Sequence, residues 1–111
     1  MDMVKTPQRF EIFWVALDPT IGSEIKKTRP CLIVSPDEMN NNLRTVIIAP
    51  LTTRSREYPS RVMTNVDGKA GDIALDQLRT IDKTRLLKKI TQLSDTTAKK
   101  VSQILVEMFL F

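Results

Sequence analysis

The sequence predicts a mainly β protein: a small antiparallel barrel that ends in one α-helix. Short runs rich in β-branched and aromatic residues alternate with polar turns along most of the 111-residue chain. Near the C-terminus the apolar residues instead recur at the period of a helix. No repeat, low-complexity tract or linker interrupts the pattern, so we expect one domain over residues 1–111.

The first strand is expected at residues 11–17, which are rich in Ile, Phe, Trp and Val. Asp18-Pro19 should end it, because proline cannot donate to a β-ladder. Residues 20–28 should form an exposed loop, and residues 31–35 a buried strand. Since a residue before proline is driven into extended geometry, Arg29 should stand at the start of that strand.

A short helix should follow, with the Ser35 hydroxyl as its cap and Pro36 at its first position. The run Asn40-Asn41-Asn42 should end it. Residues 45–51 form the most apolar segment and are the expected central strand. The polar and basic residues 52–56 should then form a loop or strand end.

Two strands at residues 61–66 and 72–78 should pair through the turn Asp67-Gly68, and residues 90–93 should form a short last strand. Ser94 or Asp95 should cap the final helix. Its apolar face consists of Ala98, Val101, Ile104, Leu105 and Met108. The apolar tail at residues 109–111 either forms a subunit interface or folds back on its own core.

The chain is moderately basic, with a net charge of +4 and a sequence pI of 9.5. This charge favours an anionic partner, such as nucleic acid, an anionic membrane surface or an acidic protein, although solubility alone explains it equally well. No apolar run is long enough to span a bilayer, and the N-terminus lacks the apolar stretch of a signal peptide. We therefore expect a cytoplasmic protein that does not bind membranes.

Histidine is absent, and Cys31 is the only cysteine. These facts exclude histidine-dependent triads, zinc sites with imidazole ligands and any two-histidine ribonuclease mechanism. We expect no metal and no cofactor. Cys31 lies in an apolar run and should be a buried structural thiol. Trp14 lies inside the first strand and should belong to the core rather than form a stacking platform.

Three segments carry a resemblance to a known family. Asp18-Pro19-Thr20 with Gly22-Ser23-Glu24 and Thr28-Arg29-Pro30 resembles the first-loop signature of MazF/PemK toxins. Residues 47–53 resemble the second signature of that family and residues 76–82 the third. They occur in the family's order with similar spacing, and the match extends from about Glu11 to the C-terminal helix.

The resemblance implies an SH3-like antiparallel barrel, shared with the CcdB/Kid/PemK superfamily. It also implies a toxin that cleaves single-stranded mRNA at short motifs without a metal ion. The RNA 2′-hydroxyl would attack, leaving 2′,3′-cyclic phosphate and 5′-hydroxyl ends, and translation would stop. Members form homodimers and are silenced by a MazE-like antitoxin whose acidic tail lies in the RNA groove.

On this resemblance the catalytic candidates are Arg29, Thr52, Glu24 and Asp76. The Arg29 guanidinium can grip two phosphate oxygens and stays charged, unless it is an ordinary surface arginine. Thr52 can hydrogen-bond a phosphate oxygen, unless it is an ordinary strand threonine. Glu24 and Asp76 both remain open as the general base. Some relatives pair the matching aspartate with an arginine two positions earlier; Ala74 stands there, which favours Arg29 with Thr52.

Further residues are expected to contact RNA through its phosphates or bases: Lys26, Lys27, Thr28, Thr53, Arg54, Arg56, Tyr58, Gln77 and Arg79. Arg61 could also follow the phosphates, although each of these cations taken alone is as well explained as a solvated surface charge. Thr28 occupies a position where some relatives carry histidine. Two alternatives remain: a CcdB-like gyrase poison, whose aromatic-glycine C-terminus this chain lacks, and a non-catalytic barrel that binds single-stranded RNA.

Overall fold

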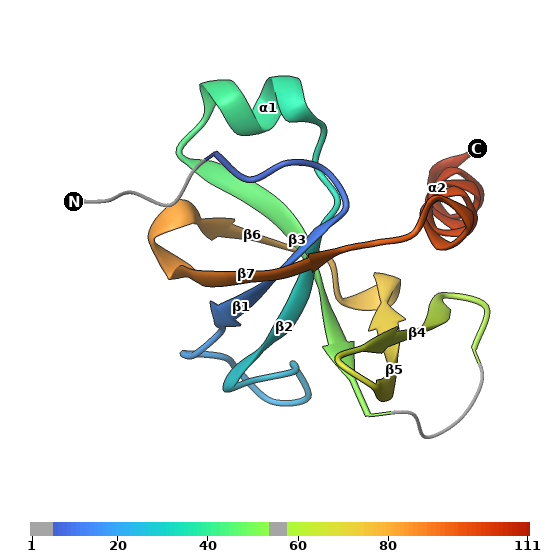
Figure 1. Ribbon diagram of the computed structural model, residues 1–111, viewed down its shortest axis with the longest axis horizontal. Helices are drawn as coiled ribbons and strands as arrows, with labels where there is room; N and C mark the ends of the chain where they lie inside the picture. Colours follow the sequence, from blue (N-terminus) through green and yellow to red (C-terminus); the bar gives the residue numbers. More distant parts are fainter. Residues whose placement is uncertain (1–5, 54–57) are drawn as a thin grey trace.

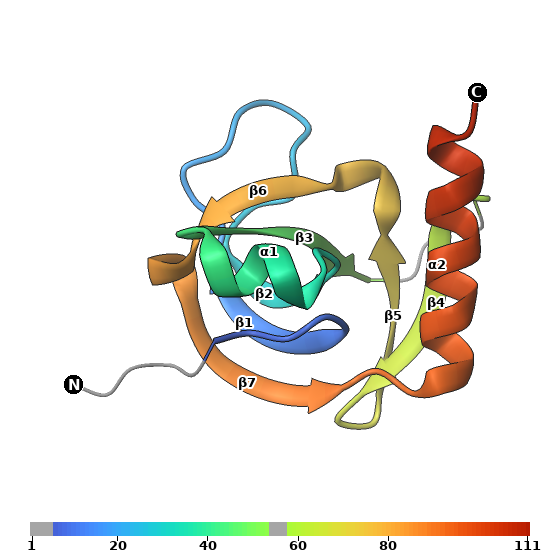
Figure 2. The same cartoon turned by 90° about the horizontal axis from the view of Figure 1, so that it is seen from above.

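The computed structural model describes residues 6–53 and 58–111, and within them one antiparallel sheet of seven strands curls into a half-barrel (Figures 1 and 2). The strands are β1 Glu11–Ala16, β2 Thr28–Ile33, β3 Thr45–Thr52, β4 Arg61–Val66, β5 Lys69–Ala74, β6 Arg79–Asp82 and β7 Leu86–Gln92. The helices are α1 Asp37–Asn42 and α2 Asp95–Phe109, with 3-10 turns η1 Leu75–Gln77 and η2 Lys83–Arg85. The predicted class, a small antiparallel barrel with a C-terminal helix, is confirmed.

Strand β3 is the hub of the sheet. The strand order in the sheet is β4-β5-β3-β2-β1-β7, and β6 also pairs with β3. The first half of β3 pairs with β6, from Thr45 opposite Asp82 to Ile48 opposite Arg79. Its last two residues pair with β5 instead, where Thr52 lies opposite Asp72. Because one edge of β3 changes partner along its length, the sheet bends there and curls.

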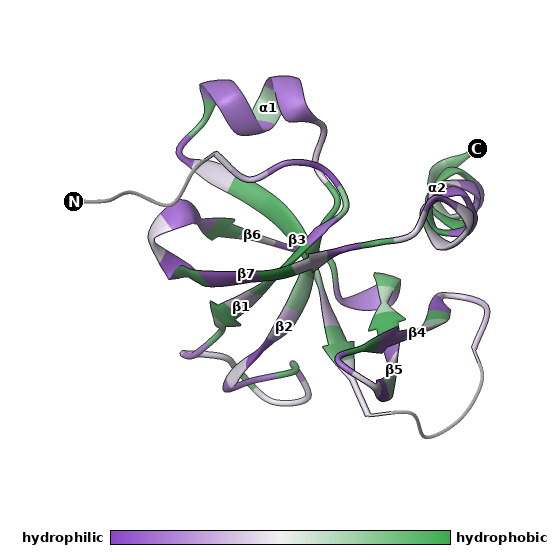
Figure 3. Cartoon of the chain, viewed as in Figure 1, coloured by the Kyte–Doolittle hydropathy of each residue, from purple (hydrophilic) through white to green (hydrophobic). Residues whose placement is uncertain are grey.

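The curled sheet has two buried clusters, one on each face. Successive strand residues point to opposite faces, so Ile12 and Phe13 enter different clusters. The Phe13 cluster fills the inside of the curl, with Val15, Leu17, Cys31, Ile33, Val46, Ile48, Ile81 and Leu86. The Ile12 cluster lies between the sheet and α2. Figure 3 shows the resulting pattern: green central strands and a largely purple α1.

Helix α2 begins as the sequence predicts, because the Ser94 hydroxyl accepts a hydrogen bond from the Thr97 backbone N–H at 3.3 Å. Its buried residues, Ala98 and Val101, belong to the Ile12 cluster. The tail at residues 109–111 is exposed, so the alternative in which it folds back on its own core is wrong. Among the described residues, no helix has the length and apolar character needed to cross a membrane.

Several predicted strand limits are wrong. Strand β2 covers Thr28–Ile33 rather than residues 31–35, and Arg29 is its second residue. The strand expected at residues 72–78 divides into β5 and the turn η1. Strand β6 was not predicted, and β7 covers Leu86–Gln92 rather than residues 90–93. The exposed lysines of β7 concealed it, because an edge strand with a solvated face lacks the apolar run that marks a buried strand.

The predicted cap of α1 is also wrong. Pro36 occupies the cap position, and no side chain bonds there. Ser35 is instead buried in a polar network: its hydroxyl donates to Asn40 Oδ1 at 2.5 Å and accepts from the Ile47 N–H at 3.0 Å. Asn40 is fully buried and donates from Nδ2 to the Ser35 carbonyl at 2.9 Å. This network ties α1 to β3.

Trp14 is not a core residue, contrary to the prediction. Its side chain is 40% exposed, although Ile12, Phe13 and Val15 around it are at most 2% exposed. Trp14 shares its sheet face with Ile12. Helix α2 covers that face at Ile12, where Ala98 and Val101 pack, but not at Trp14. The strand pattern showed which face Trp14 occupies but not how far the covering helix extends.

Candidate functional site

The loop between β1 and β2 is held in place by backbone carbonyls at its base. Arg85 Nη1 donates to the carbonyls of Ala16 and Asp18, at 3.0 and 2.6 Å. The Asp18 carboxylate accepts from the Lys27 N–H at 3.1 Å, and Lys27 adopts a left-handed φ of 74°. The Leu17 N–H closes the loop by donating to the Lys27 carbonyl at 3.2 Å. The loop therefore has a defined path where it enters β2.

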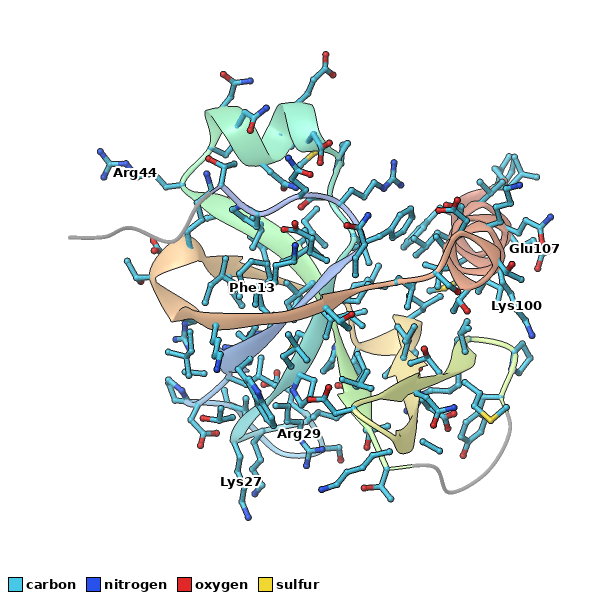
Figure 4. The ribbon with its side chains drawn as sticks, viewed as in Figure 1. Phe13, Lys27, Arg29, Arg44, Lys100 and Glu107 are labelled. Carbon is cyan, nitrogen blue, oxygen red and sulfur yellow. The ribbon has the colours of Figure 1, made fainter. Side chains whose placement is uncertain are left out.

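Arg29 uses this loop to position its guanidinium. Its Nε donates to the Lys26 carbonyl at 2.9 Å. That bond uses one of the five N–H groups of the side chain. The side chain is half-buried, and Figure 4 shows it beside Lys27 at the end of the sheet opposite α1 and Arg44. The charged fork of Arg29 thus faces the same end of the molecule as the loop lysine.

Arg29 and Thr52 line the same cavity, which has a volume of about 280 Å³. The β2–β3 pairing ends with Cys31 opposite Pro50, and Arg29 and Thr52 each lie two residues beyond that pair. We call this the arginine cavity. It is lined by Trp14, Arg29, Pro30, Leu51, Thr52, Thr53, Val66, Asp67, Lys69, Ala70 and Gly71. The structure therefore brings together the two residues expected to hold the phosphate.

The hairpin of β4 and β5 forms the far wall of the arginine cavity. Gly71 lies against the end of β3, where a Cβ on this residue would come within 3.0 Å of the Thr52 carbonyl oxygen. This contact is tighter than most Cβ contacts in proteins, so the position favours glycine. The absence of a side chain at Gly71 therefore lets the hairpin lie close to Thr52.

The two candidate bases line a different cavity, of about 250 Å³. We call it the carboxylate cavity. It is lined by Leu17, Glu24, Ile25, Ile48, Pro50, Asp76, Gln77, Leu78 and Arg79. Thus the four predicted catalytic residues divide into two pairs, Arg29 with Thr52 and Glu24 with Asp76.

Asp76 is engaged by an arginine from a neighbouring strand. Arg61 of β4 donates from Nε to Asp76 Oδ1 at 2.6 Å and from Nη2 to Oδ2 at 3.0 Å. The Ser60 hydroxyl adds a bond to Oδ1 at 3.1 Å. These bonds, led by that of Arg61, lower the pKa of Asp76. Arg61, which the sequence analysis expected to contact RNA phosphates, is hydrogen-bonded to Asp76 instead, and it lies opposite Ala74 on the neighbouring strand.

The other side chains of the carboxylate cavity support the β1–β2 loop. Glu24 Oε1 accepts from the Ile21 N–H at 3.0 Å, and Gln77 Oε1 accepts from the Ile25 N–H at 3.5 Å. Arg79 Nη2 donates to the Pro19 carbonyl at 3.4 Å. Its Nη1 is buried and has no hydrogen-bond partner among the described residues. A buried cationic donor of this kind can bind an anion.

The two cavities are neighbours, because Leu51 lines the arginine cavity and the preceding residue, Pro50, lines the carboxylate cavity. Burial raises the pKa of the Cys31 thiol to about 12, while the positive charges of Arg29 and Arg79 act in the opposite direction. Both guanidinium groups, one from each cavity, are therefore close enough to influence the same sulfur. The thiol is buried, as the sequence predicts. We infer that the cavities are two neighbouring parts of one site at this end of the sheet.

The remaining predicted contacts lie at three places. Lys26, Lys27 and Thr28 are exposed beside Arg29, and Thr53 lines the arginine cavity. Tyr58 lines a separate cavity of about 320 Å³ between β4 and α2, with the Arg61 guanidinium 5.5 Å from its ring centre. Arg54 and Arg56 lie outside the described residues.

Two cavity residues, Trp14 and Lys69, were missed by the sequence analysis. Trp14 is a strand aromatic whose indole N–H is polar, but its exposure depends on where α2 packs, which is at Ile12 and not at Trp14. Lys69 follows the predicted Asp67-Gly68 turn. Nothing local distinguishes it from a solvated turn residue, because its place beside Thr52 arises from the pairing of β5 with β3.

Comparison with known proteins points to one family. The family model described as "PemK-like, MazF-like toxin of type II toxin-antitoxin system" matches residues 8–109. The chain is 34% identical to the endoribonuclease EndoA of Bacillus subtilis, covering 88% of this chain and 90% of that relative. It is 35% identical to the endoribonuclease MazF of Staphylococcus saprophyticus, over 86% and 84% of the two chains.

Solved structures agree on the fold. The crystal structure of MazF from Deinococcus radiodurans superposes with a TM-score of 0.85 at 23% identity, over 97% of this chain and all of the other. An endoribonuclease from a mycobacterial species, solved in complex with its cognate antitoxin, superposes with a TM-score of 0.76 at 25% identity, over 91% and 92% of the chains.

Proposed function

The chain belongs to the PemK-like, MazF-like toxin family of type II toxin–antitoxin systems and is an endoribonuclease of that family, and we propose that it cuts single-stranded mRNA at short motifs without a metal ion. One observation carries the proposal: Arg29 and Thr52, from different strands, line one cavity. A guanidinium and a hydroxyl that line one cavity suit a phosphodiester, because both can donate to its oxygens. Cleavage of mRNA would stop translation in the cytoplasm.

The reaction needs no nucleophile from the protein, because RNA carries its own. A base takes the proton from the 2′-hydroxyl, the 2′-oxygen attacks phosphorus, and the bond to the 5′-oxygen breaks. The leaving 5′-oxygen takes up a proton, so the products are a 2′,3′-cyclic phosphate and a 5′-hydroxyl end. Arg29 stabilises the negative charge that builds on the phosphate oxygens, and Thr52 holds the phosphate for in-line attack.

Glu24 is the better of the two candidate bases. Asp76 is bound by Arg61 through both carboxylate oxygens, which lowers its pKa and its basicity. Glu24 is exposed on the loop next to Arg29, and the contact resolved for it is the Ile21 N–H at Oε1. Its other carboxylate oxygen, Oε2, can therefore face a bound 2′-hydroxyl.

Cleavage of a long single-stranded RNA in EDTA tests the proposal. The expected result is a few discrete cuts whose ends carry cyclic phosphate and 5′-hydroxyl groups. The Arg29→Ala variant should cleave about 10²–10³-fold more slowly, the usual cost of removing one donor that stabilises the transition state. Arg44→Ala is a matched control, because this arginine lies at the opposite end of the sheet.

Two outcomes of this assay contradict the proposal. RNA that is bound but stays intact would indicate a non-catalytic RNA-binding barrel. Near-normal cleavage by Arg29→Ala, with Arg44→Ala also normal, would remove Arg29 from the mechanism. In either case thermal unfolding of each variant shows whether the fold has survived.

We also infer a homodimer that is silenced by an antitoxin with an acidic, partly apolar tail. The exposed apolar residues Phe109 and Leu110 support a subunit contact, and the basic residues around Arg29 favour an acidic partner. Light scattering on the purified chain should give twice its 12.7 kDa mass. Co-expression with the neighbouring open reading frame should relieve toxicity; a monomer, or toxicity that persists, would contradict the respective inference.

A further inference from the structure

Trp14 is exposed in an otherwise buried strand. It is the only tryptophan of the chain, and 40% of it is exposed between neighbours that are almost fully covered. Its cross-strand neighbours are Pro30 on β2 and Lys88 on β7. The indole and the Pro30 ring both line the arginine cavity, so together they provide an apolar wall next to Arg29.

The opposite wall of this cavity carries a second cation. Lys69 is the first residue of β5 and lines the cavity with Arg29 and Thr52. Its place is determined by two backbone features: the left-handed turn at Asp67 and Gly68, with φ of 53° and 80°, and the close approach of Gly71 to Thr52. The cavity, of about 280 Å³, has the size of the smallest ligand sites. It is suited to one nucleotide rather than several.

We propose that Trp14 and Lys69 form a subsite for the nucleotide next to the scissile phosphate, with the indole stacked on its base and the ammonium group on its outer phosphate. This inference rests on the proposed RNA cleavage at Arg29 and Thr52. An aromatic face beside cations is the arrangement that holds single-stranded nucleic acid. Every base has a π-face, so the subsite requires a base but discriminates weakly among the four.

The walls also determine which part of the nucleotide meets which residue. Arg29 and Thr52 lie at the strand ends and hold the scissile phosphate. Trp14 and Pro30 are cross-strand neighbours one residue further along β1 and β2 and line the same cavity, where the base of the adjoining nucleotide would rest. Lys69, on the hairpin, is then left for the next phosphate along the chain. The three groups of a single nucleotide thereby each have one partner.

A substrate change paired with a protein change tests the stacking. A short RNA with one mapped cut is prepared in three forms: intact, with an abasic ribose on the 5′ side of the cut, and with an abasic ribose on its 3′ side. Wild-type protein should cut one of the abasic RNAs about 10–100-fold more slowly under single-turnover conditions. The Trp14→Ala variant should lose a similar factor on intact RNA and nothing further on that abasic RNA. Trp14→Phe should retain most of the rate.

Two results would overturn the stacking. In the first, the rate losses caused by Trp14→Ala and by the abasic ribose multiply when the two changes are combined. In the second, Trp14→Ala cuts intact RNA as fast as the wild-type protein does. A second readout needs no variant. Since all tryptophan emission comes from Trp14, an uncleavable RNA with a 2′-deoxy residue at the cut should alter the emission, and its abasic form should not. An equal response to both RNAs would also overturn the stacking.

Lys69 is tested by the salt dependence of binding. Lys69→Met should reduce the slope of log K against log salt by about 1, as expected for one lost phosphate contact. Lys100→Met, which removes a lysine from the distant helix α2, should leave the slope unchanged. Equal slopes for wild type and Lys69→Met would remove Lys69 from the subsite. A wild-type protein that cuts no RNA defeats the proposed function itself, whereas normal cutting by the Trp14 and Lys69 variants defeats only this inference.

Discussion

Replacing Asp76 by asparagine should cost stability but leave RNA cleavage within about threefold of wild type. Asparagine keeps the shape of the side chain and removes its charge, so the ion pair with Arg61 is lost. Were Asp76 the general base, the same change would remove it and slow cleavage about 10²–10⁴-fold. The single substitution therefore separates a structural carboxylate from a catalytic one.

The stability cost follows from the geometry of the pair. Both carboxylate oxygens are engaged, at 2.6 and 3.0 Å, but the side chains remain 16% and 36% exposed for Arg61 and Asp76. Solvent therefore screens the pair, and we expect a coupling free energy of about 1 kcal/mol. Because the pKa of Asp76 is lowered in the folded chain, this contribution is complete above the unfolded carboxyl pKa of about 3.9. It disappears as the pH falls through the lower folded value.

A double-mutant cycle measures this coupling. Asp76→Asn, Arg61→Met and the double variant are unfolded in urea at fixed protein concentration, and the coupling is the non-additive part of the three changes. Glu24→Gln provides the matched catalytic comparison, because it keeps the oxygen that accepts from Ile21. It should cut about 10²–10⁴-fold more slowly. A folded Asp76→Asn variant that cleaves a hundredfold more slowly, or a coupling near zero, would refute this reasoning.

Two further predictions concern buried groups. Burial raises the pKa of Cys31 from 9.0 to about 12, which leaves about 10³-fold less thiolate near neutral pH. Iodoacetamide should therefore modify Cys31 in urea but not in buffer. Fast labelling of the native chain would contradict the burial. Ser35→Ala should lower the free energy of unfolding by about 1–3 kcal/mol, because Ile47 and Asn40 lose their partner. Ser94→Ala, which removes only a helix cap, should lower the free energy of unfolding by about 1 kcal/mol in the same urea titration. A larger loss for Ser94→Ala than for Ser35→Ala would show that the Ser35 network is weaker than its geometry indicates.

Local signals in the sequence were sufficient for the fold class and for the long elements. The periodicity of residues 95–109 and the hydroxyl of Ser94 predicted α2 and its start, because both signals act within a few residues. The same local argument failed at Ser35, where a hydroxyl followed by Pro36 has the pattern of a helix cap. Its actual partners, Asn40 and Ile47, are brought together by the packing of α1 on β3. A capping pattern cannot show whether a nearby strand competes for the hydroxyl.

The site was predictable in part, and mostly through resemblance. No spacing in the sequence indicates that Arg29 and Thr52 meet; the register of β2 and β3 brings them together. The pair of Arg61 and Asp76 was beyond sequence reasoning, since it depends on β4 lying against η1, where the Leu75 N–H donates to the Ser60 carbonyl at 3.0 Å. The arginine that bonds Asp76 comes from another strand rather than from position 74, which is alanine.

The position of the site follows from what the helices leave uncovered. Helix α2 covers one face of the sheet at Ile12, and α1 closes the end near β3 and β6 (Figure 1). At the opposite end the β1–β2 loop, the end of β3 and the β4–β5 hairpin meet without a helix over them. Trp14 is exposed there for that reason, and Arg29 has solvent access there. Helix α2 packs over Ile12 and leaves Trp14, two residues further along β1, uncovered, so the exposed tryptophan belongs to the open end that RNA must enter.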